Sequence, residues 1–264
     1  PNTTITSLHS SHVERVKALL GSRGKKFRRE EKAFIADGIQ SVREALQPRI
    51  ASAPAVKALY VTEAGLTKLN SEIPSSALAA VDIYPVTEEV MKAMADTESP
   101  QGILALCTYT EMTLYKLGQL GAGKIAYFWE LQDPGNSGTV IRTADACGFD
   151  AIIFSENSVD IFNPKTIRAT VGSLWHIPVI TDVEIADFIK QSRDNGFKSF
   201  ALMGEGDLIL NKDLLASCGD KSLWIFGNEA RGLPELPESV DSVRIPMKGH
   251  AESLNVASAA AIVM

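Results

Sequence analysis

The sequence is poor in the residues that build metal centres and disulfide frameworks. Its 264 residues include only three cysteines and four histidines. Cys107, Cys147 and Cys218 are widely spaced and form no Cys-x-x-Cys pair, and no histidine stands at a metal-ligand spacing from them. We therefore expect free thiols in a reducing compartment and no bound metal.

Three longer signals are also missing. No apolar run approaches the roughly 18 residues of a membrane span, and the first residues lack the basic-then-apolar pattern of a secretory signal. We expect no membrane association and, by elimination, a cytoplasmic location. No Gly-x-Gly-x-x-Gly follows a strand-like segment, so a nucleotide-dependent oxidoreductase, one alternative function, has little support.

The charge is unevenly distributed along the chain. The net charge is −6, which taken alone disfavours nucleic acid as a partner. Residues 21–32, however, contain six basic residues and two glutamates, so this stretch carries +4 and the remainder −10. It is either a solvated charged loop or an RNA-binding element. In the second case the candidate phosphate contacts are Arg23, Lys25, Lys26, Arg28 and Arg29.

Hydrophobic periodicity and turn residues predict strands that alternate with helices along the whole chain. The expected strands are residues 33–36, 56–61, 80–84, 103–109, 125–129, 151–154, 176–180, 200–203, 223–226 and 243–245. Helices are expected between them, including one that begins at Asn163-Pro164. We predict an α/β protein with an N-terminal domain over residues 1–113, a glycine-rich linker over 114–123 and a second domain over 124–264.

Three polar segments of the second domain occur where strands are expected to end, which is where open α/β sheets hold ligands. The first segment runs from Asn136 to Arg142, and the second runs from Gly227 to Leu233. The third segment consists of residues 245–247 and residues 252–255. They contain glycines, few acids and an arginine at the end of the first segment. That combination suits a small cofactor and a polar nucleophile, and it does not suit a metal or a Ser-His-Asp triad.

Ordinary structural roles stay open for the same residues. Asn136 could cap a helix, and Arg142 could pair with the acid three residues later. Glu229 could be a solvated loop acid and Ser253 a helix N-cap. Asn255 is harder to explain in this way, because asparagine is a poor helix former and the closing segment is rich in alanine.

With these motifs, residues 124–264 resemble the SpoU (TrmH) family of RNA ribose 2′-O-methyltransferases, in the SPOUT superfamily. The family's first motif, Asn-x-Gly-x-x-x-Arg-Thr-Ala, matches residues 136–144. The second matches Gly227-Asn228-Glu229 with Gly232, and the third matches Ile245-Pro246-Met247 with Ser253-Leu254-Asn255. Residues 13–109 resemble the RNA-binding domain of many such enzymes, which is similar to a small ribosomal-protein fold.

The resemblance implies a trefoil-knotted SPOUT methyltransferase domain with a parallel sheet, preceded by the small α/β RNA-binding domain. It also implies a homodimer in which the arginine of one subunit completes the site of the other. The cofactor would be S-adenosylmethionine, which already carries a positive charge and therefore needs no metal. The implied cofactor-binding residues are Met203, Gly204, Gly227, Ile245, Met247, Ser253 and Leu254. The implied catalytic residues are Arg142, Asn136, Glu229, Ser253 and Asn255.

The implied function is S-adenosylmethionine-dependent 2′-O-methylation of a ribose in RNA. Ribosomal RNA is favoured over transfer RNA, because the separate N-terminal domain resembles that of ribosomal RNA modifiers. A transfer RNA methyltransferase and a non-catalytic RNA-binding module with the same fold stay open as alternatives. Arginine is a very weak base, so we expect Arg142 to orient the hydroxyl and an adjacent phosphate and to stabilise developing negative charge.

Overall fold

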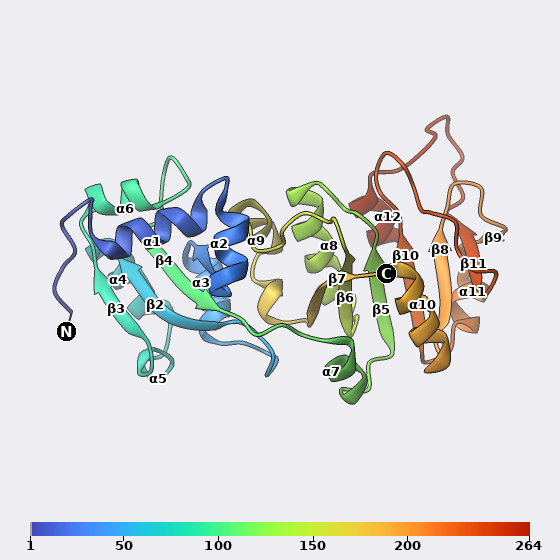
Figure 1. Ribbon diagram of the computed structural model, residues 1–264, viewed down its shortest axis with the longest axis horizontal. Helices are drawn as coiled ribbons and strands as arrows, with labels where there is room; N and C mark the ends of the chain where they lie inside the picture. The colour runs from blue at the N-terminus through green and yellow to red at the C-terminus, as the bar shows by residue number, and fades with distance from the viewer. Residues whose placement is uncertain (1) are drawn as a thin grey trace. The chain divides into compact units, whose positions relative to one another are not determined.

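Two separate sheets organise the chain, and a computed structural model describes residues 2–264 (Figure 1). The contacts divide the chain into two units. The first unit contains the residues up to Thr110 together with Asp160–His176, and the second contains Glu111–Val159 and Ile177–Met264. This division differs from the expected one in two places. Residues 160–176 group with the first unit, and the expected linker contains helix α7 (Leu114–Gln119), whose Leu117 is buried against the second unit's core.

The sheet of the first unit has four strands in the order β1-β4-β2-β3. The strands are β1 (Ala33–Asp37), β2 (Ala55–Val61), β3 (Asp82–Pro85) and β4 (Ile103–Thr108). β4 runs antiparallel to both β1 and β2, whereas β2 and β3 are parallel. All four predicted strands are confirmed, with boundaries shifted by one or two residues.

Helices cover both faces of this sheet. They are α1 (Ser11–Leu20), α2 (Gly24–Glu31), α3 (Ile39–Leu46), α4 (Glu63–Glu72), α5 (Ser75–Leu78) and α6 (Glu88–Met94). Valines of α1 and methionines of α6 pack on one face with Ile35 and Tyr60. Ser10 and Thr87 cap α1 and α6 through their hydroxyl groups, as short polar side chains do at helix starts. α5 was not predicted, because four residues are too few to show a period.

The segment Asp160–His176 joins the first unit through aromatic packing. It carries α9 (Pro164–Thr170), capped by Asn163 as predicted, and the short 3-10 helix η1 (Ser173–Trp175). Phe162 stacks on Phe34 of β1 with ring centres 4.9 Å apart. The indole nitrogen of Trp175 donates to the carbonyl oxygen of Pro54 at 3.2 Å.

Arg28 of α2 anchors the same segment. Its side chain is only 4% exposed, and Nε lies 2.8 Å from Oδ2 of Asp160. Nη1 donates to the carbonyl oxygen of Leu19 at 2.6 Å. The expectation that Arg28 contacts RNA phosphates is therefore wrong, because a buried and paired guanidinium is not available to an external phosphate. The basic stretch is also a helix over most of its length, not the solvated loop of the alternative interpretation.

The sheet of the second unit is entirely parallel, with seven strands in the order β7-β6-β5-β10-β8-β11-β9. The strands are β5 (Lys124–Phe128), β6 (Ala151–Ser155), β7 (Val179–Val183), β8 (Lys198–Leu202), β9 (Leu208–Ile209), β10 (Ser222–Phe226) and β11 (Val240–Arg244). The predicted parallel α/β architecture is confirmed. β7 begins three residues later than expected, and the two-residue β9 was too short to be predicted.

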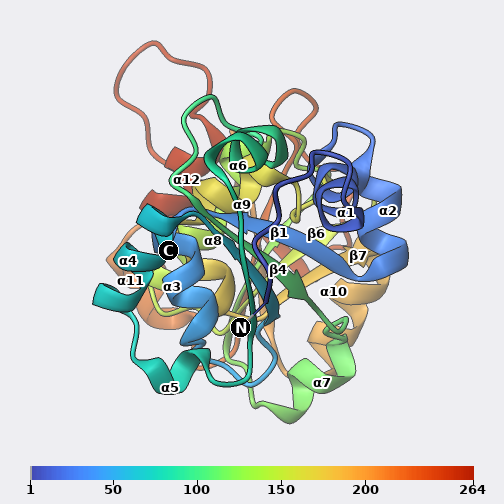
Figure 2. The ribbon, with the colours of Figure 1, turned by 90° about the vertical axis from the view of Figure 1, so that its left-hand side faces the viewer.

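Helices pack on both faces of this sheet as well, so its central strands are buried on both sides. They are α7, α8 (Pro134–Ala146), α10 (Ile185–Asp194), α11 (Lys212–Ser217) and α12 (Val256–Val263). Phe188 of α10 and Leu117 of α7 share a core with Tyr127 of β5. α12 packs along α8, and Figure 2 shows these two helices on the opposite side of the strands from α7 and α10.

We predict that Arg28→Ala lowers the free energy of unfolding by about 3 kcal/mol or more, because it leaves the Asp160 carboxylate largely buried without its cation. Urea denaturation followed by circular dichroism measures this loss. Lys26→Ala, on the same helix with a side chain 85% exposed, is the control and is expected to cost about 0.5 kcal/mol or less. Equal stabilities for the two variants would refute the anchoring role.

Candidate active site

A cavity of about 440 Å³ lies where β8, β10 and β11 end. Residues after each of these strands line it, and the segment before α12 completes the wall. The lining includes all seven residues that the sequence predicts for cofactor binding, namely Met203, Gly204, Gly227, Ile245, Met247, Ser253 and Leu254. Residues separated by as many as 51 positions along the chain are thus brought to one site.

The cavity combines apolar side chains with polar groups. Met203, Met247 and Leu254 are large apolar residues that line it and are nevertheless exposed. Glu229 and Ser253 add a carboxylate and a hydroxyl. Exposed apolar side chains gathered around a hollow are typical of a surface that an organic ligand covers.

Gly227 is needed because two segments of the same loop pack closely together at this position. A Cβ atom at this position would lie 2.6 Å from the carbonyl carbon of Gly232. The two chain segments come this close because Asn228 and Gly232 exchange two backbone hydrogen bonds, both 2.9 Å long. Gly232 itself has φ +66°, a conformation that favours glycine. Residues 227–232 therefore form a tightly closed loop, which we call the cavity loop.

Asn136 and Asn255 meet across the helix pair α8 and α12. Asp133 caps α8, with its Oδ1 accepting from the backbone N–H of Asn136 at 2.7 Å, so Asn136 lies in the first turn and is not the cap. Asn255 caps α12 and Ser253 does not, because Oδ1 of Asn255 accepts from the backbone N–H groups of residues 257 and 258. Nδ2 of Asn255 then donates to Oδ1 of Asn136 at 3.2 Å, which joins the first and third motifs.

Arg142 is exposed near the middle of α8 and does not line the cavity. Its side chain makes no hydrogen bond or ion pair with any residue of the described range 2–264, so the alternative of a pair with Asp145 is not realised. Glu229, by contrast, lines the cavity from the middle of the cavity loop. The hydrogen-bond donors of the Arg142 guanidinium therefore have no side-chain or backbone acceptor within the described range.

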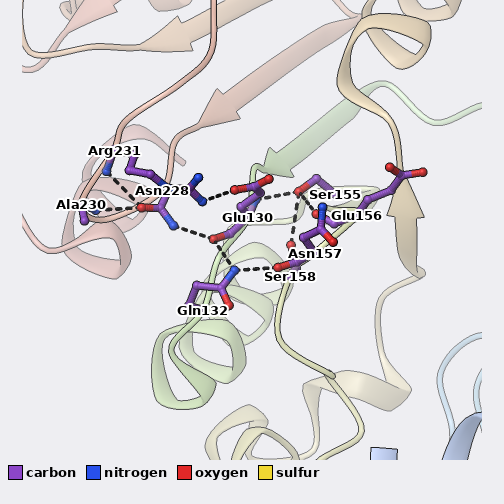
Figure 3. Close-up of polar contacts among 9 residues, drawn as sticks. All are labelled: Glu130, Gln132, Ser155, Glu156, Asn157, Ser158, Asn228, Ala230 and Arg231. Atoms are coloured by element: carbon purple, nitrogen blue, oxygen red, sulfur yellow. Dashed lines mark hydrogen bonds and ion pairs between the residues drawn. The ribbon is translucent and has the colours of Figure 1, made fainter. Parts of the chain in front are cut away.

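A network that the sequence did not reveal supports the cavity loop (Figure 3). Asn228 bonds to the carbonyl oxygen of Glu130, in the loop after β5, and Gln132 donates to the same oxygen. The Arg231 side chain pairs with the Glu130 carboxylate. Asn228 belongs to the second motif and Arg231 lies two residues after its glutamate, so both could have been suspected. Glu130 and Gln132 carry no sequence signal of their own.

The remaining candidates for RNA contact lie on and beside α2, in the first unit. Arg23, Lys25, Lys26 and Arg29 are exposed. Lys26 pairs with Glu30 at 3.7 Å. Arg28 is excluded by its burial.

Within residues 2–264, no group of three or more His, Cys, Asp or Glu side chains is placed to hold a metal ion. Over the same part of the chain, no helix is long and apolar enough to cross a membrane. All three cysteines are free thiols, and burial raises the pKa of Cys107 and Cys218.

Comparison with protein families gives two matches that together span most of the chain. Residues 124–264 match the model of the SpoU rRNA Methylase family. Residues 13–105 match the model of the MRM3-like substrate binding domain.

Individual relatives cover nearly the full length. The chain is 33% identical over 259 residues to the 23S rRNA (guanosine(2553)-2'-O)-methyltransferase RlmP of Bacillus subtilis, covering 97% of each protein. It is 27% identical over 269 residues to the 23S rRNA (uridine(2479)-2'-O)-methyltransferase of Streptomyces viridochromogenes, covering 98% of this chain and 90% of that protein. Among solved structures, an AdoMet-bound rRNA methyltransferase from Sinorhizobium meliloti superposes with a TM-score of 0.81 at 28% identity, covering 99% of this chain and 95% of the other.

The family model matches more than half of the chain, and a relative aligns over almost its entire length. All three motifs lie inside the matched region, and the second and third of them line the cavity. The chain belongs to the SpoU rRNA Methylase family.

Proposed function

We propose that this protein transfers the methyl group of S-adenosylmethionine to the 2′-hydroxyl of a ribose in ribosomal RNA. The observation that carries the proposal is the single cavity lined by all seven residues expected to bind the cofactor. Relatives named as ribosomal RNA 2′-O-methyltransferases align over nearly the whole chain, including the part that matches a substrate binding domain. This full-length likeness favours ribosomal RNA over transfer RNA as the substrate.

The cavity fits the proposed cofactor in size and in chemistry. Its volume of about 440 Å³ lies within the range of small-molecule sites. Met203, Met247 and Leu254 offer apolar surface, and residues of three strand-end loops offer backbone donors and acceptors. When bound, S-adenosylmethionine supplies an electrophilic methyl group on a positively charged sulfur.

The protein's own residues must orient the ribose hydroxyl and stabilise the charge that develops on its oxygen. Arg142 suits this task, because a guanidinium can bind a phosphate and donate to an oxygen that is becoming negative. Its exposure, and its place outside the cavity of its own chain, support action in the site of a neighbouring copy. Asn136 and Asn255 hold the start of α8 against the third motif. Positioning of this kind lowers the barrier. As the oxygen–methyl bond forms and the sulfur–methyl bond breaks, the hydroxyl proton leaves to water or to the arginine.

We further propose a homodimer in which Arg142 of the partner subunit completes each site. The alanine-rich helix α12 supports it, since small side chains allow close approach of another backbone and Ile262 is left 53% exposed. The cytoplasm is the compartment proposed, because free thiols persist in reducing surroundings.

A trefoil knot is proposed for the second unit. β10 lies inside the sheet between β5 and β8, although the earlier strand β9 already forms the edge. After β11 the chain returns to pack α12 along α8. A chain that places β10 between the earlier strands β5 and β8, adds β11 between β8 and β9 and then crosses back supports a threaded connection, which is rare among folds.

We predict that Arg142→Ala reduces methyl transfer at least about 100-fold and changes the dissociation constant of S-adenosylmethionine by less than about twofold. A radiolabelled methyl-transfer assay and calorimetric titration measure the two quantities. Arg193→Ala is the control, because Arg193 is exposed on α10 and pairs only with its neighbour Asp194. Cofactor affinity lost in the Arg142 variant, or activity kept, would contradict the role.

A second prediction concerns the basic residues around α2. Changing Arg23, Lys25, Lys26 and Arg29 to glutamine should weaken RNA binding and flatten its salt dependence, by about 0.7 to 0.9 in the log–log slope per lost phosphate contact. The matched control removes the same charge from four other exposed residues of the first unit, Arg49, Lys57, Lys68 and Lys92. Filter binding over a series of salt concentrations compares the two variants. Equal slopes for both would exclude the α2 residues as contacts.

A further inference from the structure

We propose that Asn228, Glu130 and Arg231 form an inter-loop latch that positions Glu229 for methyl transfer. Glu229 lies in the cavity loop between Asn228, whose side chain bonds to Glu130, and Ala230, whose backbone N–H donates to the Asn228 side chain. Asn228 itself lines the cavity, but its amide groups are used within the latch, so we treat it, like Glu130 and Arg231, as a positioning residue. This inference rests on the proposed function, because Glu229 matters only if the cavity is the methyl-transfer site.

Asn228 is the centre of the latch. It is only 8% exposed, and its amide makes three hydrogen bonds (Figure 3). Oδ1 accepts from the backbone N–H groups of Ala230 and Arg231 at 2.9 and 3.0 Å, which folds the cavity loop around Glu229. Nδ2 donates to the carbonyl oxygen of Glu130 at 2.8 Å, which ties that loop to the loop after β5. One side chain thus sets both the shape of the cavity loop and its place.

Glu130 is the partner on the other loop. It has φ +47°, a left-handed conformation that is unfavourable for a residue with a side chain. Its N–H donates to Oγ of Ser155 at 2.6 Å, and its carbonyl oxygen accepts from Gln132 as well as from Asn228. These bonds hold the backbone in that conformation, and they aim the carbonyl oxygen at the cavity loop.

Arg231 adds a side-chain contact between the same two loops. Its guanidinium pairs with the Glu130 carboxylate and lies 5.4 Å from the ring centre of Trp129. The Glu130 side chain is 16% exposed and the Arg231 side chain 61% exposed, so this part of the latch is reached by solvent. Asn228 therefore supplies the buried contact and Arg231 the outer one.

The latch connects two parts of the proposed site. The cavity loop carries Glu229, and the loop of Glu130 leads into α8, whose first turn carries Asn136. Asn136 in turn accepts a hydrogen bond from Asn255 of the third motif. Loosening the contact between Asn228 and Glu130 is expected to displace Glu229 relative to Asn136, while the rest of the sheet stays intact.

The decisive variant is Asn228→Asp. An aspartate keeps oxygen acceptors for the backbone N–H groups of residues 230 and 231, and it removes the N–H donor to the carbonyl oxygen of Glu130. We expect the folded variant to bind S-adenosylmethionine about tenfold more weakly and to have a kcat reduced at least about tenfold. Asn211→Asp is the matched control. Asn211 caps α11 with an accepting oxygen and does not line the cavity, so aspartate should serve equally well there.

Calorimetry on the wild-type protein comes first and separates the two proposals. A wild type that does not bind S-adenosylmethionine refutes the proposed function. If the wild type binds and turns over, and Asn228→Asp matches it in both affinity and kcat, the latch is refuted. A role in folding alone would lower the melting temperature of the variant and leave its kcat and affinity unchanged, which also refutes the latch.

Arg231→Gln decides the question if Asn228→Asp does not fold. The Arg231 side chain is exposed, so replacing it creates no cavity in the core. We expect two- to fivefold weaker cofactor binding, roughly the effect of losing a partly exposed ion pair. The measurement is made without RNA, so an RNA contact of Arg231 cannot produce the change. Unchanged cofactor affinity in this variant would overturn the proposal.

Discussion

The parallel pairing of β5, β10, β8 and β11 is the constraint on which the site depends. Parallel strands end at the same edge of a sheet, so the segments that follow them meet there whatever their distance in sequence. The loops after β8, β10 and β11 form the cavity, and the loop after β5 supports it through Glu130. A strand paired in the opposite direction would carry its loop to the other edge of the sheet, and the cavity would then lose one of its walls.

Hydrogen bonds of asparagine side chains convert this coarse arrangement into a defined geometry. Asn255 caps α12 and reaches Asn136 on α8, and Asn228 closes the cavity loop and reaches Glu130. An amide can donate and accept at once, so it can fix a local turn and a distant loop together. Aspartate would serve the turns equally well and would lose the connections between segments.

Some features followed from local patterns and others did not. The strands and the Asn163 cap were predicted, because apolar alternation and capping chemistry act over a few residues. The second and third motifs also identified residues that line the cavity, whereas Asn136 and Arg142 of the first motif do not line it. The burial of Arg28 was missed, because its partner Asp160 is 132 positions away and nothing near Arg28 distinguishes it from its exposed neighbours. Capping of α12 was one possible role of Ser253, and the cap is Asn255, since both residues are suitable and only the backbone decides between them.

The sequence by itself determined the class of fold, the family and the residues around the cavity, because each rests on residue types at short, regular spacings. Only the tertiary structure decided which chain segments belong together. It grouped residues 160–176 with the first unit, joined Asn136 to Asn255 and set Glu130 in a left-handed conformation beneath the cavity loop. These outcomes depend on burial and on hydrogen bonds between residues about a hundred positions apart, and no local pattern encodes such pairings.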